Sequence, residues 1–339
     1  MSRIKQLRLV LPNVLSQLRA MLQRGEVADI PPLLLALLLQ GERQRLWQEH
    51  DLGYARLDPW QHSVLCTLPE SLRPHGIAAG ALCWRGEGGN WRPGTWMQLE
   101  LLHLAAGMDN LSVVLPASLD ATDVKQLMAS LQPIFSLLGF ELQCSPAGHW
   151  YIWCERQLEL LTYSVHSGFA TRMYDILPSG PDGPELRRLM TEIQMLLHQQ
   201  PLNTQREQQG LPTLNALWFS GAGTLELVTA TTTQRIFSND AYVQGLCDHL
   251  QVSCWPLPAN ALGLLSGYDE DVVAVTANSS LPNLEQEWLA PIIRALAMGS
   301  IGQVDLHLDQ WRIMLYGGRW QQLRRMFTRT TADLQELVA

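Results

Sequence analysis

The most informative stretch of this sequence, residues 177–223, reads LPSGPDGPELRRLMTEIQMLLHQQPLNTQREQQGLPTLNALWFSGAG. Apolar residues recur on one face of a predicted helix from Pro184 to Gln199, and a proline suits the first helical turn. The apolar run from Leu214 to Phe219 then predicts a strand that leads into a glycine-rich turn. A helix followed by a strand in this way is typical of α/β proteins.

The sequence on both sides of this stretch continues the alternation. Further strands are expected at residues 6–12, 234–237, 252–256, 272–276 and 304–309. Further helices are expected over residues 14–49, with an interruption at Pro31 and Pro32, and at 241–250 and 285–297. The order predicts a largely parallel, doubly wound sheet.

Residues 111–153 predict a compact α+β module of βαββ order. A strand at 111–115 precedes a helix that Asp120 or Thr122 can cap, and residues 140–143 and 149–153 form a hairpin. Upstream, the run from Trp84 to Trp96 is rich in glycine and tryptophan and indicates an exposed or semi-ordered loop. Its glycine spacing does not match a dinucleotide-binding fingerprint.

Composition narrows the class of protein. The 339 residues carry a formal net charge of −8, which argues against a nucleic-acid surface, and the Arg-rich run from Arg319 to Arg329 is interpreted as a solvated helix face. The longest apolar run, Pro31 to Leu39, is about half of the roughly 20 residues that a membrane span requires, so we expect no membrane contact and no signal peptide. Six cysteines without a C-x-x-C pair favour a reducing cytoplasm.

Eight residues of the first stretch form an ordered pattern with fixed spacing: Asn203, Arg206, Gly210, Pro212, Asn215, Trp218, Gly221 and Gly223. The pattern resembles the archaeal and bacterial cofactor-independent phosphoglycerate mutases of the alkaline phosphatase superfamily. His166 stands where that family has a histidine. The run EIQMLLH at 192–198 and the pair Trp150-Tyr151 look closer to the RpfE-type regulatory proteins related to these mutases.

The resemblance implies an α/β fold with a doubly wound, alkaline-phosphatase-like core and an inserted α+β domain. Residues 1–99 and 214–339 would form the core, and residues 100–213 the substrate-covering-like insert. Working mutases hold two divalent metals at strand ends. Here Pro12-Asn13 replaces the family's D-G, Thr276 replaces a histidine, and His307 and Asp309 stand alone. We therefore expect no metal, no cofactor and no catalytic residues.

The leading hypothesis is a degenerate, non-catalytic bacterial protein with a regulatory or ligand-sensing role. One alternative is a 2,3-bisphosphoglycerate-independent phosphoglycerate mutase or phosphatase with an unconventional site. Another is a protein-interaction module, since the chain has 12 tryptophans. The expected partners are a small phosphorylated or carboxylated metabolite and a protein, with neither nucleic acid nor membrane.

The candidate ligand-binding residues are Asn203, Arg206, Asn215, Gly221, Gly223 and His166. A guanidinium group matches phosphate or carboxylate bidentately, and amides orient hydroxyl groups. The same three polar residues can instead lock the loop between the helix and the strand. Gly221 and Gly223 can let the backbone approach an anion, or can serve turn geometry alone.

Overall fold

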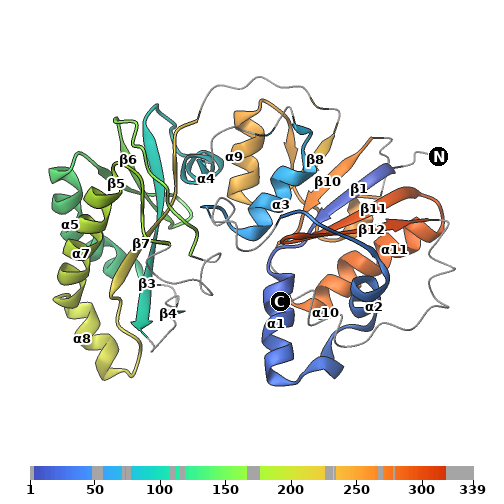
Figure 1. Cartoon of the computed structure of the whole chain (residues 1–339), viewed down its shortest axis with the longest axis horizontal. Coiled ribbons are helices and arrows are strands. Elements are labelled where there is room, and N and C mark those ends of the chain that lie inside the picture. The colour runs from blue at the N-terminus through green and yellow to red at the C-terminus, as the bar shows by residue number, and fades with distance from the viewer. Residues whose placement is uncertain are drawn as a thin grey trace.

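The computed structural model describes residues 4–47, 56–70, 73, 78–106, 111–114, 119–165, 176–225, 232, 234–265, 270–277 and 279–317. Two β-sheets organise them, one in each half of the molecule (Figure 1). A seven-stranded sheet has the order β2-β12-β11-β1-β10-β8-β9, and a five-stranded sheet has the order β4-β3-β6-β5 with β7 paired to β3. No helix in these ranges is long and apolar enough to cross a bilayer.

The strands of the seven-stranded sheet are β1 (Ile4–Val10), β2 (Glu42–Arg45), β8 (Arg235–Phe237), β9 (Cys254–Trp255), β10 (Val272–Val275), β11 (Ile301–Leu308) and β12 (Trp311–Tyr316). The strands of the five-stranded sheet are β3 (Thr95–Ala106), β4 (Leu111–Val114), β5 (Glu141–Cys144), β6 (Trp150–Cys154) and β7 (Ala216–Gly223).

The α-helices are α1 (Val14–Arg24), α2 (Pro32–Gln40), α3 (Pro59–Thr67), α4 (Ala79–Gly86), α5 (Ala121–Leu137), α7 (Gly183–His198), α8 (Pro201–Gln208), α9 (Ala241–His249), α10 (Leu281–Leu284) and α11 (Ala290–Ala297). The shorter turns are η1 (Val27–Asp29), η4 (Ala261–Gly263) and the π-helical η5 (Glu285–Leu289), which joins α10 to α11.

The seven-stranded sheet is parallel at its centre and doubly wound, as the sequence predicted. β1 pairs in parallel with β10 and β11, β10 with β8, and β8 with β9, whereas β12 and β2 add antiparallel strands at one edge. Side chains alternate between the two faces because successive residues of a strand point to opposite sides. Leu7 and Leu9 of β1 pack toward α1, α2 and α11, and Val10 packs toward α3, α4 and α9.

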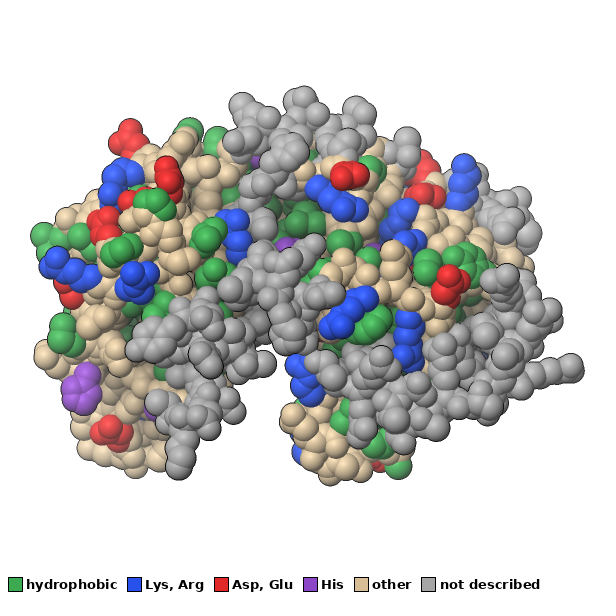
Figure 2. Space-filling view, in the orientation of Figure 1, with side chains coloured by type: hydrophobic (Ala, Val, Ile, Leu, Met, Phe, Trp, Pro, Cys, Tyr) green, Lys and Arg blue, Asp and Glu red, His purple; other side chains and the backbone are tan. Residues whose placement is uncertain are grey.

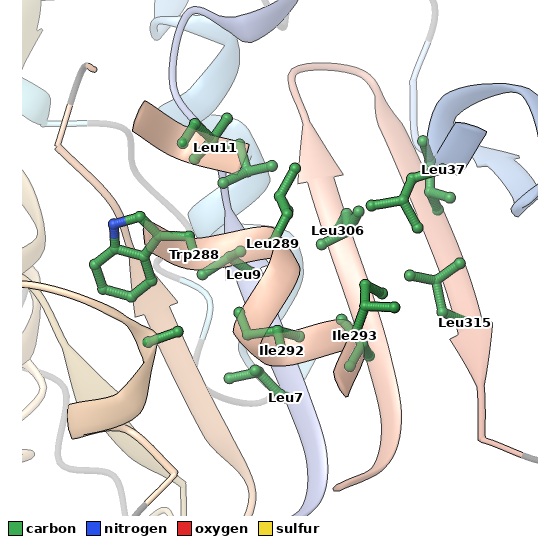
Figure 3. Close-up of a cluster of buried hydrophobic side chains, with 14 of the residues drawn as sticks. Leu7, Leu9, Leu11, Leu37, Trp288, Leu289, Ile292, Ile293, Leu306 and Leu315 are labelled. Atoms are coloured by element: carbon green, nitrogen blue, oxygen red, sulfur yellow. The ribbon is translucent and has the colours of Figure 1, made fainter. Parts of the chain in front are cut away.

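The core on the first face is aliphatic. Figure 3 shows Leu7, Leu9 and Leu306 of the sheet beside Leu289 and Ile292 of the covering helices. All five side chains are fully buried. Burial of each side chain of this size contributes roughly 1.5–3 kcal/mol, so this layer fixes the helices on the parallel sheet.

The five-stranded sheet is antiparallel and carries α5 and α7 on one face (Figure 1). The strand expected at residues 214–219 is present as β7, but it does not join the parallel sheet: it pairs antiparallel with β3. Asp120 caps α5 as expected, accepting hydrogen bonds from the amides of Thr122 and Asp123. Because β3 runs across residue 99 and β7 follows residue 213, the second sheet spans residues 95–223. The domain limits themselves stay a prediction.

Three further local expectations differ from the structure. Helix is absent from residues 42–45, which instead form the edge strand β2 because β12 offers them an unpaired edge. The run from Trp84 to Trp96 is not an exposed segment throughout, since Trp84 and Trp96 are buried and stack with ring centroids 5.0 Å apart. β12 was not expected, and it returns from β11 through a tight turn in which Asp309 has a φ of 47°.

The helix pair α4 and α9 lies where the two sheets meet (Figure 1). α4 packs on β3 and β7 of the second sheet, and its side chains share a core with those of α9, β8 and β10. Glycines permit this close approach: a Cβ on Gly86 would lie 1.8 Å from the carbonyl oxygen of Ala241, and one on Gly245 the same distance from that of Leu82. The two helices thus connect the two halves of the molecule and line the space between the two sheets.

Candidate functional site

A cavity of about 320 Å³ lies at the carboxyl ends of β1, β8 and β10. Pro12 and Asn13 follow β1 and line it, and Thr276 follows β10. Trp60 of α3 and Asp240, which precedes α9, complete its polar and aromatic wall. The carboxyl ends of parallel strands are where open α/β sheets bind ligands, because strand-end loops converge there.

A second cavity, of about 150 Å³, adjoins the first, since Trp60 and Asp240 line both. Its other lining residues come from the five-stranded sheet, from α3 and from the helix pair, and include Glu87 after α4 and Tyr151 of β6. We call the two cavities together the cleft. The cleft therefore forms only when the chain brings the parallel and antiparallel sheets together.

Asp240 has a structural as well as a chemical position in the cleft. Its Oδ1 accepts hydrogen bonds from the amides of Tyr242 (2.8 Å) and Val243 (3.3 Å), which caps α9. Burial raises the pKa of Asp240, and the nearby carboxylates of Asp58 and Glu87 raise it further, against the opposing effect of the two amide hydrogen bonds. The shift indicates a desolvated and negative environment.

Glu87 and Tyr151 provide polar atoms without hydrogen-bond partners. Oε1 of Glu87 lies 2.6 Å from Nδ1 of His149, whereas its Oε2 is buried and has no partner. The hydroxyl of Tyr151 is likewise buried and unpartnered. Burial raises the pKa of Tyr151, and the charges of Cys83 and Glu87 and the nearness of the Glu87 carboxylate to the hydroxyl raise it further, so this phenol remains a neutral hydrogen-bond donor.

The residues at the strand ends do not fit the two divalent metals that the family resemblance implies. Such ions require several hard oxygen or imidazole ligands at one point. The residues lining the strand-end cavity supply side-chain amides from Asn13 and Asn239, a hydroxyl from Thr276, and the carboxylate of Asp240, which already caps a helix. In the described ranges no three His, Cys, Asp or Glu side chains converge to hold a metal ion.

Asn203 and Asn215, two of the predicted ligand residues, bond to the main chain of α7, of the segment before β7 and of β3. The amide of Asn203 donates to the carbonyls of Leu197 (2.7 Å) and Leu214 (2.9 Å) and accepts from the Leu214 amide (2.7 Å). Asn215 makes a reciprocal pair with the main chain of Leu104, at 2.7 and 2.9 Å. These bonds match the loop-locking role that the sequence left open.

The other predicted residues that the structure describes belong to α8 and to β7 of the five-stranded sheet. Nε of Arg206 donates to the Pro212 carbonyl at 2.8 Å. Gly221 lines the smaller cavity, and its φ of 63° and close approach to Gly80 of α4 both require glycine. Gly223 pairs with Trp96 in the sheet, and His166 lies outside the described residues. Only Gly221 of the predicted set appears among the described lining of the cleft. A ligand-binding role for the others stays a prediction.

His307 and Asp309, the remaining metal-ligand candidates, lie beside β1 rather than in the lining of either cavity as described. His307 pairs with Val10 across the sheet and is 2% exposed, and both ring nitrogens lack partners. Burial lowers the pKa of His307 to about 3. Asp309 is in the turn before β12, where its carbonyl accepts a hydrogen bond from Ser63.

The sequence pointed to Asn13, Thr276 and Gly221 but missed most of the cleft. Asp58 and Asp240 carry a local signal, since each is an acidic N-cap residue directly before a helix. Glu87 and Tyr151 carry none, because they are far apart in the chain and meet only in the folded structure.

Comparisons with known proteins give likenesses to solved structures only. No protein-family model matches the chain, and no curated protein matches it. The cofactor-independent phosphoglycerate mutase from Thermoplasma acidophilum DSM 1728 is 16% identical, with 100% of both chains covered and a TM-score of 0.38. The PH0037 protein from Pyrococcus horikoshii is 13% identical, with 90% of this chain and 82% of that chain covered and a TM-score of 0.38. Scores this low carry no conclusion about function.

Proposed function

We propose that this protein is a degenerate, non-catalytic relative of the phosphoglycerate mutases that senses a small ligand in the cleft, with a regulatory role of the RpfE type. The motif at residues 177–223 supports the ancestry. The parallel-rich α/β sheet, with its cavity at the strand ends, supports a ligand-binding role.

One observation carries the proposal: the cleft is present although the strand ends, as far as the structure describes them, hold no set of metal ligands. Phosphoryl transfer between two metals needs a nucleophile and several ligands at the same point. Among the described residues that line the strand-end cavity, Asp240 alone bears a charge. A cavity of about 320 Å³ that opens into a second one suits binding better than this chemistry.

A reducing cytoplasm is part of the proposal. All six cysteines are free, and three of them are buried: Cys83, Cys154 and Cys247. Free buried thiols of this kind behave as small apolar side chains and persist where glutathione keeps them reduced.

The protein-interaction alternative receives less support from the tryptophans. Six of them are buried in the structure: Trp47, Trp84, Trp96, Trp150, Trp218 and Trp288. Among the described residues, Trp255 is the one tryptophan that is exposed, at 45%. On the face shown in Figure 2, charged and apolar side chains are interspersed over both halves.

The proposal is tested by an activity assay and a binding screen on the full chain. Mutase turnover is measured with 3-phosphoglycerate and manganese, manganese binding by calorimetry, and ligand binding by thermal shift against a panel of small metabolites. We expect no turnover, no pair of tight manganese sites, and a rise in Tm with at least one metabolite.

A matched pair of variants distinguishes turnover by this protein from turnover by a contaminating mutase. Asp240→Asn removes the charge at the strand ends but keeps a residue that caps helices well. Glu192→Gln removes a surface charge on α7. Turnover that Asp240→Asn abolishes and Glu192→Gln leaves intact would overturn the non-catalytic assignment, and a panel without any stabilising compound would overturn the sensing role.

A further inference from the structure

The smaller cavity combines carboxylates with aromatic rings. Four acidic side chains line it: Asp58, Glu87, Glu100 and Asp240. Two basic side chains, Arg56 and His149, also line the cavity. Trp60, Tyr151 and Tyr242 add ring surface, with Trp60 and Tyr242 in an edge-to-face contact whose centroids lie 6.0 Å apart. Carboxylates and aromatic faces together are the chemistry that recognises organic cations.

The carboxylates act on one region. Burial raises the pKa of the Cys83 thiol, and the four carboxylates raise it further in the order Asp240, Glu87, Asp58 and Glu100. A thiol responds in this way only when the surrounding charges are near enough to repel its own negative form. The space beside Cys83 therefore has a negative potential, which disfavours an anion such as phosphate.

Two buried polar atoms in the lining, Oε2 of Glu87 and the hydroxyl of Tyr151, lie near each other but make no hydrogen bond of normal geometry. The Glu87 side chain is 6% exposed and Tyr151 is 0% exposed. A buried polar group left unsatisfied costs free energy, because it has given up its hydrogen bonds to water. A ligand that donates to Glu87 removes this cost and neutralises part of the acidic excess, whereas an anionic ligand adds to the excess.

The arrangement favours an organic cation over a metal ion. A divalent metal needs several oxygens within about 2.6 Å of one point. The described His, Cys, Asp and Glu side chains do not provide three such donors at one point. An alkylammonium group donates three hydrogen bonds in different directions, and its methylene groups can contact ring faces.

The size of the cavity limits the ligand. Its volume is about 150 Å³. An engineered apolar cavity of about this volume accommodates benzene, a molecule of about six heavy atoms. A diamine with a four-carbon chain has the same number of heavy atoms and carries a charge at each end, so one molecule can reach two carboxylates.

We propose that the cleft binds a small organic cation of the alkylamine or diamine class, with an ammonium group donating to Glu87 and Asp240 among the rings of Trp60, Tyr151 and Tyr242. The proposal rests on the ligand-sensing function above and names its ligand class. The proposed ligand is a cation and so differs in charge from the anionic phosphorylated or carboxylated metabolite that the family resemblance implies.

The test uses calorimetry on the full chain at pH 7.5 with four probes of equal length: 1,4-diaminobutane, n-butylamine, 1,4-butanediol and succinate. We expect the diamine to bind most tightly and the monoamine more weakly, with no measurable binding of the diol or the dianion. Glu87→Gln and Asp240→Asn should each weaken diamine binding about tenfold or more, because a hydrogen bond to a charged group is worth roughly 1.5–3 kcal/mol. Glu192→Gln, the matched surface control, should leave the affinity unchanged.

The outcomes separate this proposal from the proposed function. Tighter binding of succinate or 3-phosphoglycerate than of the amines overturns the charge assignment and leaves the sensing role intact. Equal binding of diol and diamine, or full affinity in Glu87→Gln, overturns the role of the carboxylates. Absence of binding by both amines overturns this proposal even if another metabolite binds, and absence of all binding overturns both. The probe series on the unmodified chain decides the question if a variant fails to fold.

Discussion

His307 makes the stability of this protein depend on pH in a way that can be calculated. The imidazole lies on the parallel sheet with both nitrogens unpartnered, and burial lowers its pKa from 6.5 to about 3. The folded protein therefore holds His307 neutral, while the unfolded chain takes up a proton as the pH falls below about 6.5. The stabilisation is complete above that value and is lost progressively as the pH falls toward about 3.

The magnitude follows from the two pKa values. At pH 7.5 the imidazole of the unfolded chain is almost entirely neutral, so its protonation lowers the free energy of unfolding by only about 0.1 kcal/mol. At pH 5 the protonated unfolded form exceeds the neutral form by about thirtyfold, and the loss reaches about 2 kcal/mol. The variant His307→Leu cannot take up this proton, and at pH 7.5 it should equal or exceed the wild type in stability because it removes two unsatisfied nitrogens.

The assay is urea unfolding followed by tryptophan fluorescence at pH 7.5 and pH 5. From pH 7.5 to pH 5 the free energy of unfolding should fall by about 2 kcal/mol more for the wild type than for His307→Leu. His198→Leu, at an exposed position near the end of α7, serves as the control and should follow the wild type. Parallel curves for wild type and His307→Leu would refute the reasoning, as would an NMR titration in which His307 of the folded protein protonates near its ordinary pKa.

Three other substitutions test the packing and the hydrogen bonds, each by urea unfolding at pH 7.5. Gly245→Ala would place a Cβ 1.8 Å from the Leu82 carbonyl oxygen and should destabilise by roughly 1–3 kcal/mol; unchanged stability would contradict the close contact of α4 and α9. Asp305→Ala should cost about 3 kcal/mol, because it removes a fully buried carboxylate from Arg312, and a loss below about 1 kcal/mol would argue against this ion pair. Asn203→Ala should cost roughly 2 kcal/mol through lost main-chain bonds, and an effect on ligand binding without one on stability would favour the alternative role of Asn203.

The sequence alone determined the elements with strong local signals. α2 begins at Pro32 because proline suits the first helical turn, whereas α1 already ends at Arg24, before Gly25 in the left-handed conformation. Asp120 caps α5 because its carboxylate reaches free amides. Apolar strands alternating with helices likewise predicted the parallel, doubly wound sheet. Each of these features depends on residues that are close in the chain.

Only the tertiary structure decided which sheet β7 joins and which residues meet in the cleft. An apolar run such as β7 can be buried in either sheet. It pairs with β3, a strand that is more than a hundred residues earlier in the chain. Glu87, Tyr151 and Asp240 belong to three separate elements, and no spacing relates them. The charges of Glu87 and Asp240 matter because the folded chain removes water from the space around them, and the strength of an electrostatic interaction depends on that exclusion.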